Sequence, residues 1–154
     1  MKFIEWIFGV LLLCSACEQN CVLENPLCEK WETLYVTRVE LTDTATVLSI
    51  VACGRNGDCF NLEGDQQGEI YLFGRESGCK YKYRGSSDFE VGKCYVFGES
   101  GNVHMTLRFE PLLNEERAID VITDRSEALC VRGVSLVVPN SLRHLPVCHL
   151  RGGG

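Results

Sequence analysis

The sequence predicts an all-β fold with one minor helix, a small closed five-stranded β-barrel of the oligonucleotide/oligosaccharide-binding (OB) type that is rich in disulfides. Three observations support this prediction. Segments that alternate apolar and polar residues recur along the chain, cysteines are frequent, and only one late segment has a helical period. A closed barrel is the economical architecture for such strands because closure removes exposed sheet edges.

The first sixteen residues are interpreted as a secretory signal peptide. Lys2 precedes an apolar run, residues 7–13, and small residues stand before Cys17. A membrane anchor is the alternative, but the run is far shorter than the ~20 residues needed to cross a bilayer. A bacterial lipoprotein is a second alternative, although Cys14 stands where its signal would carry leucine. We therefore expect a secreted, extracellular protein that begins at Cys17.

Length and charge restrict the remaining choices. Without the first sixteen of its 154 residues the chain has 138, which suits one domain. Acidic residues number 21 against 15 Lys and Arg, and no basic cluster occurs. The sequence thus predicts no binding of nucleic acid or anionic membranes and no insertion into a membrane.

Ten cysteines, nine of them after Ala16, require either disulfides or metal. Structural metal sites usually show paired Cys-x2-Cys motifs, and the one such pair, Cys14 and Cys17, straddles the expected cleavage site. Disulfides are therefore favoured. Four bridges would each contribute roughly 2–4 kcal/mol and would leave one thiol over.

Strands are predicted where apolar residues alternate with polar ones or where β-branched residues gather. A local Cys53–Cys59 bridge is one candidate, around the turn-forming pair Asn56 and Gly57. A segment at 89–97 is expected to pair with the strongest alternation as a hairpin through the turn 98–102. The predicted strands span residues 33–41, 45–52, 68–73 and 103–109.

The period changes after Pro111. Leu112, Ile119 and Ile122 fall on one side of a helical projection, so the sequence predicts a helix over residues 112–123. One more strand is expected at residues 134–138.

Three segments resemble the tissue inhibitors of metalloproteinases. Residues 70–79, Ile-Tyr-Leu-Phe-Gly-Arg-Glu-Ser-Gly-Cys, resemble that family's Ile-Tyr…Glu-Ser-x-Cys segment. Residues 101–106 resemble its strand with His-x-Thr, and residues 111–130 resemble its following helix and cysteine. The resemblance implies an amino-terminal netrin-like domain over residues 17–130, followed by a carboxy-terminal extension, residues 131–154.

The resemblance also implies a mechanism. The α-amino nitrogen and carbonyl oxygen of mature Cys17 would coordinate the catalytic zinc of an extracellular metalloproteinase, which keeps an open coordination position. A bridge from Cys17 to Cys79 would hold this terminus against a loop, and a second bridge would join Cys28 to Cys130. The target-contacting residues would be Glu18, Glu76, Ser77 and Gly78.

The chain departs from the family in several places. Three residues separate Cys17 from Cys21, where the family has one. The family's small residue after the first cysteine is Glu18 here, and burying its carboxylate in a specificity pocket would cost several kcal/mol, which predicts weak inhibition of ordinary extracellular-matrix enzymes. Cys94 is extra, so a substitute Cys21–Cys94 bridge is a candidate. The family's second cysteine-rich domain is missing.

The sequence predicts no enzymatic activity, because motifs such as His-Glu-x-x-His, Gly-x-Ser-x-Gly and a phosphate loop are absent. No cofactor is expected, and the only metal would be the partner's zinc. His104 is expected on the surface, and Cys148 as the unpaired thiol or an intermolecular bridge. The alternative function is a secreted netrin-like binding module without protease inhibition, in which the cysteines only staple the barrel.

Overall fold

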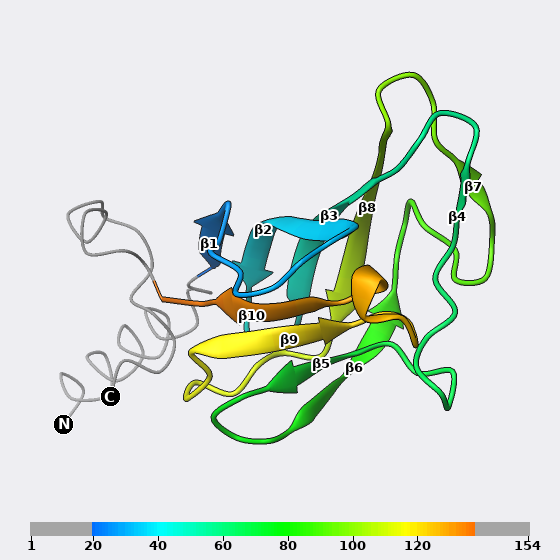
Figure 1. The fold of residues 1–154 in the computed structure, drawn as a ribbon. Helices are drawn as coiled ribbons and strands as arrows, with labels where there is room; N and C mark the ends of the chain where they lie inside the picture. Colours follow the sequence, from blue (N-terminus) through cyan, green and yellow to red (C-terminus); the bar gives the residue numbers. More distant parts are fainter. Residues whose placement is uncertain (1–19, 138–154) are drawn as a thin grey trace, which may run out of the picture.

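Alternating and β-branched segments form most of the strands in the computed structural model, which describes residues 20–137 (Figure 1). These strands are β1 (Cys21–Glu24), β2 (Leu34–Leu41), β3 (Thr46–Cys53), β4 (Cys59–Phe60), β5 (Tyr71–Gly74), β6 (Lys80–Gly85), β7 (Tyr95–Val96), β8 (Asn102–Phe109), β9 (Ala118–Ile122) and β10 (Val131–Ser135). A single 3-10 turn, η1 (Glu127–Leu129), is the only helical element in this range. The part of the chain between residues 20 and 137 contains no helix that could cross a membrane.

Eight strands form one strongly curled antiparallel sheet in the order β1-β2-β3-β8-β6-β5-β9-β10. The register shifts at three places, between Val36 and Arg38 in β2, within β6, and within β10. Such bulges bend a strand and increase its twist, which explains how the sheet curls around its apolar side.

A bend after β1 brings the two ends of the sheet together. Asn25 has a φ of 46° and is followed by Pro26, so the chain leaves β2 at this point. Residues 27–30 then run along β10. The Ser135 N–H donates to the Leu27 carbonyl at 2.7 Å, and the Arg132 N–H donates to the Lys30 carbonyl at 2.8 Å. One continuous segment thus contacts both edges of the curled sheet.

The core lies inside the curl and is mainly aliphatic. Strand β8 points Met105, Leu107 and Phe109 inward, as its alternation predicts, and all three are buried. Each such side chain contributes about 1.5–3 kcal/mol by leaving water. The other large, fully buried side chains are Leu34, Val39, Leu48, Ile50, Leu62, Leu72, Ile119, Val121 and Val131.

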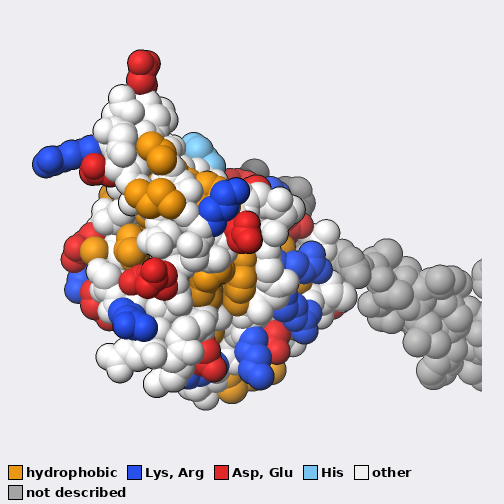
Figure 2. All heavy atoms as spheres, turned by 90° about the vertical axis from the view of Figure 1, so that its right-hand side faces the viewer, with side chains coloured by type: hydrophobic (Ala, Val, Ile, Leu, Met, Phe, Trp, Pro, Cys, Tyr) orange, Lys and Arg blue, Asp and Glu red, His pale blue; other side chains and the backbone are white. Residues whose placement is uncertain are grey.

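A two-stranded ribbon, β4 and β7, projects from the other side of the molecule (Figure 1). The Cys59–Cys94 disulfide, with a Cα–Cα distance of 5.6 Å, joins its strands. The ring of Phe60 packs against Phe89 and Phe97, with centroids 6.0 and 5.9 Å away. Figure 2 faces this side and shows hydrophobic side chains scattered among charged ones, including Val96, which is 63% exposed.

The predicted helix over residues 112–123 is wrong. Residues 118–122 instead form β9, which lies between β5 and β10 and is buried on both faces. The helical period came from too few apolar positions, and β-branched Ile119, Val121 and Ile122 favour a strand with two covered faces. Residues 111–117 form a loop.

The predicted hairpin of residues 89–97 with 103–109 is also wrong. Strand β8 pairs with β3 along its whole length and with β6 at its end, whereas only Tyr95 and Val96 of the earlier segment form a strand, which pairs with β4. The strands at 33–41, 45–52 and 103–109 are confirmed as β2, β3 and β8. The strand expected at 134–138 begins earlier, at Val131.

Candidate functional site

The loop of residues 75–79 connects β5 to β6 and contains three of the predicted target-contacting residues. Its ends are close together because the Gly74 N–H donates to the Cys79 carbonyl at 2.9 Å. Inside the loop, the Gly78 N–H donates to the Gly74 carbonyl at 2.8 Å, and Gly78 has a φ of 71°, which glycine adopts without strain. Figure 1 shows this loop on the same side of the sheet as the described chain ends, residues 20 and 137.

Glu76 holds the β5–β6 loop to the neighbouring loop of residues 111–117. Its carboxylate accepts hydrogen bonds from the backbone N–H groups of Arg117, at 2.9 Å, and Ala118, at 3.3 Å. Partial burial acts to raise the pKa of Glu76, but these N–H donors outweigh it and leave the pKa below its usual value. The carboxylate therefore faces its own protein and positions the loop.

Glu116 makes the reciprocal contact and is buried, with 4% exposure. Its Oε1 atom accepts hydrogen bonds from the Tyr81 hydroxyl at 3.0 Å and the Ser77 N–H at 3.3 Å. Oε2 has no hydrogen-bond partner among residues 20–137. Gly74 makes room for this carboxylate, because a Cβ atom there would lie 2.2–2.4 Å from its atoms. Two loops are thus locked together by two carboxylates.

Tyr81 lies beneath both loops. Besides its bond to Glu116, its hydroxyl accepts a hydrogen bond from the Leu113 N–H at 3.3 Å and lies 3.4 Å from the Ser77 hydroxyl. Burial raises the pKa of Tyr81, and the neighbouring Glu116 carboxylate adds to this effect. The ring therefore remains a neutral donor at physiological pH.

Arg75 ties the start of the loop to the segment that bends away from β1. Its guanidinium contacts the Glu29 carboxylate at 2.6 Å and the buried Asp120 carboxylate at 3.0 Å. Asp120 also accepts from the Gly133 N–H at 2.8 Å and pairs with Arg132 at 3.4 Å. The buried charge of Asp120 is thus paired on several sides, as such burial requires.

Sequence reasoning selected Glu76, Ser77 and Gly78, and the structure brings them together in one loop. It missed Glu116, Tyr81 and Asp120, because the first and last were assigned to a helix and Tyr81 to no element. A glycine directly after a buried strand, Gly74, was the one sequence signal of a close contact. Cys17 and Glu18 lie outside the described residues.

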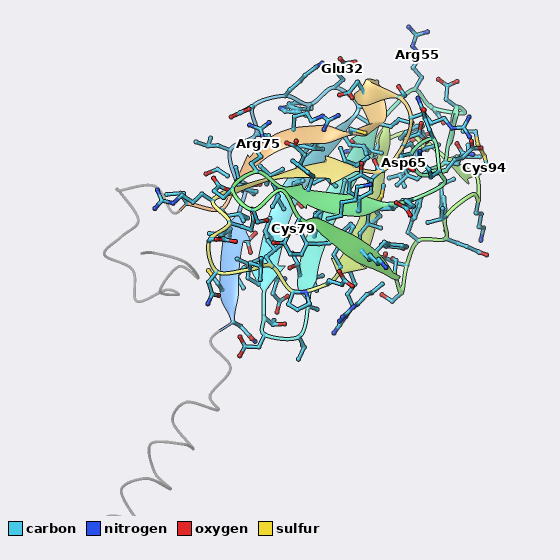
Figure 3. The ribbon with its side chains drawn as sticks, turned by 90° about the horizontal axis from the view of Figure 1, so that it is seen from below. Glu32, Arg55, Asp65, Arg75, Cys79 and Cys94 are labelled. Atoms are coloured by element: carbon cyan, nitrogen blue, oxygen red, sulfur yellow. A yellow bond between two sulfur atoms is a disulfide. The ribbon has the colours of Figure 1, made fainter. Side chains whose placement is uncertain are left out.

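The predicted disulfides fare differently from one another. Because Cys59 bonds to Cys94, the Cys53–Cys59 and Cys21–Cys94 pairings are wrong. In the structure Cys53 is an exposed thiol, and Cys21 is buried at the start of β1. Cys79 is exposed and has no disulfide to another described residue, and its predicted partner lies outside them (Figure 3).

The predicted Cys28–Cys130 bridge is not formed, and both residues are thiols in the structure. The antiparallel register explains this, because Lys30 lies opposite Arg132. Cys28 therefore lies near Val134, some four residues or roughly 13 Å along the strand from Cys130. A disulfide needs Cα atoms within about 7 Å.

Within residues 20–137, no group of three His, Cys, Asp or Glu side chains is placed to hold a metal ion. His104 lies exposed on β8, as the sequence predicts, while His144, Cys148 and His149 lie outside this range. No protein family, curated protein or solved structure matches the chain. The geometry alone thus describes a rigid loop at one end of a curled sheet.

Proposed function

We propose that the chain is a secreted, non-enzymatic inhibitor of zinc metalloproteinases whose mature amino terminus, Cys17, coordinates the zinc of the target. The α-amino group has a pKa near 8 and loses its proton readily to fill an open metal position. The carbonyl oxygen of the same residue would supply a second ligand. The chemistry remains the enzyme's, and the inhibitor blocks the metal.

The observation that carries this proposal is the placement of the β5–β6 loop. This loop lies on the same side of the sheet as Asn20, where the described chain begins three residues after Cys17 (Figure 1). Its exposed Cys79 is available for the proposed bridge to Cys17. Such a bridge would join the zinc-binding amine to a loop already fixed by Glu76 and Glu116.

A fixed loop favours inhibition because little conformational entropy is lost on binding. The hydrogen bonds of Glu76 to the Arg117 and Ala118 N–H groups, and of Glu116 to the Ser77 N–H, hold the loop before any partner arrives. Since Glu76 faces inward, Ser77 and Gly78 are the residues of this loop that we assign to target contact.

We further propose that the curled sheet is a netrin-like OB-type barrel. The hydrogen bonds between residues 27–30 and β10 support this, because they connect the first and last strands of the eight-stranded order. The netrin-like domain would then include β10, which belongs to the same sheet.

Glu18 determines the expected target range. We predict that Glu18→Thr strengthens inhibition of matrix metalloproteinases by more than about tenfold, because an unpaired carboxylate in the specificity pocket costs several kcal/mol. Titration of both proteins against the same enzymes measures the change. Equal or weaker inhibition by the variant would show that Glu18 is not the obstacle.

The decisive experiment combines amino-terminal sequencing of the secreted protein with titration against a panel of zinc metalloproteinases. A Cys17 terminus with tight inhibition of a panel member supports the proposal. A matched control adds one alanine before Cys17, which moves the free amine and should abolish inhibition while the fold is kept. If the secreted form begins elsewhere, or no enzyme is inhibited, the binding module without protease inhibition is the better description.

A further inference from the structure

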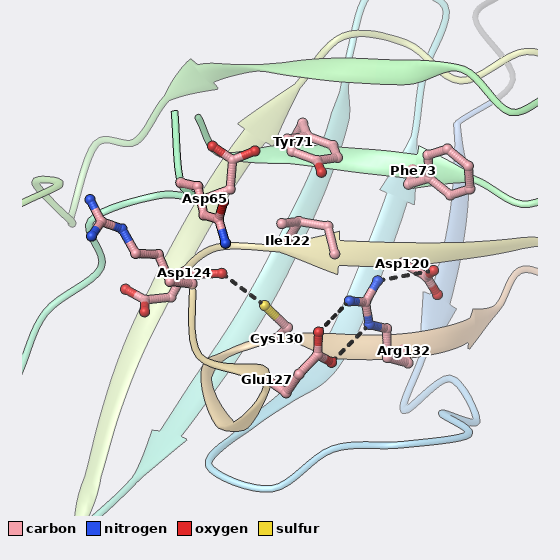
Figure 4. Close-up of a pocket in the computed structure, with 11 residues that line it drawn as sticks. Asp65, Tyr71, Phe73, Asp120, Ile122, Asp124, Glu127, Cys130 and Arg132 are labelled. Atoms are coloured by element: carbon pink, nitrogen blue, oxygen red, sulfur yellow. Dashed lines mark hydrogen bonds and ion pairs between the residues drawn. The ribbon is translucent and has the colours of Figure 1, made fainter. Parts of the chain in front are cut away.

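A hollow of about 370 Å³ lies on the outer face of β5, β9 and β10, away from the β5–β6 loop (Figure 4). This volume is in the range of sites that bind small ligands or single side chains. Tyr71, Phe73 and Ile122 give it an apolar floor, and the segments around Asp65 and Asp124 form its rim. Nothing in the proposed inhibitory mechanism uses this surface.

The hollow carries more negative than positive charge. Its lining includes four carboxylates, those of Asp65, Asp120, Asp124 and Glu127, against the two guanidinium groups of Arg125 and Arg132. Arg132 is fully engaged, because it contacts Glu127 at 2.6 Å and Asp120 at 3.4 Å. The side chain that could attract an anion is thus neutralised inside the protein.

Asp65 supplies an acceptor that the fold leaves available. Its Oδ1 atom accepts from the Gln67 N–H at 2.9 Å and the Glu69 N–H at 3.0 Å, and both hydrogen bonds shape the 65–69 turn. Within residues 20–137 its Oδ2 atom accepts none. By contrast, both oxygens of Asp124 accept from backbone N–H groups, of Ser126 at 3.0 Å and Glu63 at 3.2 Å.

Tyr71 offers a second attraction for a cation. The ammonium of Lys80 already lies 4.4 Å from the centroid of the Tyr71 ring, so this ring accepts a positive charge in its own protein. The hollow therefore combines an aromatic ring, an apolar floor and a carboxylate oxygen that faces no donor. A group with a cationic end on an apolar stem matches all three.

We propose that this hollow binds a lysine side chain of a partner protein. The methylene groups would cover Phe73 and Ile122, and the ammonium would donate to Asp65 Oδ2 near the Tyr71 ring. The net charge of −6 of the whole chain also favours a basic partner. This site is independent of the proposed zinc-blocking terminus.

The test uses the full secreted chain, labelled with ¹⁵N, and follows its amide signals by NMR. The probe is the capped tripeptide acetyl-Gly-Lys-Gly-amide, and its matched control carries norleucine in place of lysine. The lysine peptide should shift the amide signals around Asp65, Tyr71 and Ile122 in a saturable manner, whereas the norleucine peptide should not. Cadaverine, a free diamine, should bind more weakly than the peptide.

Asp65→Asn should weaken the lysine peptide about tenfold, because it removes the charge and keeps an oxygen for the turn. Glu99→Gln removes the same charge from a distant turn and should leave binding unchanged. If Asp65→Asn loses signal dispersion, Tyr71→Leu serves instead, with a weakening of about threefold expected. Equal binding of norleucine, tighter binding of cadaverine, or unaltered affinity in the folded variants would overturn the proposal.

Discussion

The β5–β6 loop and the β4–β7 ribbon lie at different ends of the molecule and are held in different ways. Hydrogen bonds from N–H and O–H groups to two carboxylates, those of Glu76 and Glu116, fix the loop. The ribbon is fixed by the Cys59–Cys94 disulfide and by packed aromatic rings. Figure 3 shows the separation, with Arg75 and Cys79 far from Cys94.

This difference teaches that the two regions should respond to different agents. A disulfide restricts the unfolded chain and is lost on reduction. A carboxylate that accepts backbone hydrogen bonds is lost as a strong acceptor when acid protonates it. Reductant should therefore weaken the ribbon first, and acid should weaken the loop first. Three substitutions test this comparison.

The largest effect is expected in the ribbon. Replacing both Cys59 and Cys94 by alanine removes a bridge across 35 residues and should lower the free energy of unfolding by about 4 kcal/mol. Urea unfolding of the purified protein measures this change. Cys53→Ala, which removes an exposed thiol, is the control and should alter it by less than about 0.5 kcal/mol. A double variant as stable as the parent would contradict the structural role of the bridge.

A smaller effect is expected where the two loops meet. Gly74→Ala places a Cβ atom 2.2–2.4 Å from the Glu116 carboxylate, so the buried acid must move, at a cost of about 2–3 kcal/mol. Gly98→Ala is the matched control, since nothing lies within 4 Å of its added Cβ atom. Thermal or urea unfolding distinguishes them. Equal stability of the two variants would show that the loops are not tightly joined at Gly74.

The smallest effect depends on pH. Glu76→Gln should lower the free energy of unfolding by about 1 kcal/mol at pH 7, because a charged acceptor becomes a neutral one. The pKa of Glu76 is lower in the folded than in the unfolded protein, so its contribution is present above about pH 4.3 and is lost as pH falls through the folded pKa.

Urea unfolding at pH 7 and pH 3 checks this last prediction. The difference between the parent and Glu76→Gln should shrink at pH 3, where both carry a neutral side chain. Glu90→Gln removes an exposed carboxylate elsewhere and controls for net charge. A difference that stays constant across this pH range would remove the carboxylate of Glu76 from the account.

The sequence allowed good predictions where a strand has one buried face. The alternation of β8 and the β-branched residues of β3 located both strands, because a half-buried strand must repeat every second residue. It failed for β9, whose two buried faces remove that alternation, and so it also failed to place Glu116 and Asp120. The Cys59–Cys94 pairing depends on how distant strands meet, which spacing along the chain does not encode.

The segment that turns at Asn25 and Pro26 has a consequence for how the protein is made. Lys30 meets Arg132 across on the order of a hundred intervening residues, and such distant pairings fold slowly. During synthesis, residues 27–30 must wait until β10 has been translated before their edge of the sheet is covered. The nascent protein therefore presents an uncovered strand edge for a period, which makes it a client for chaperones rather than a chain that folds as it emerges.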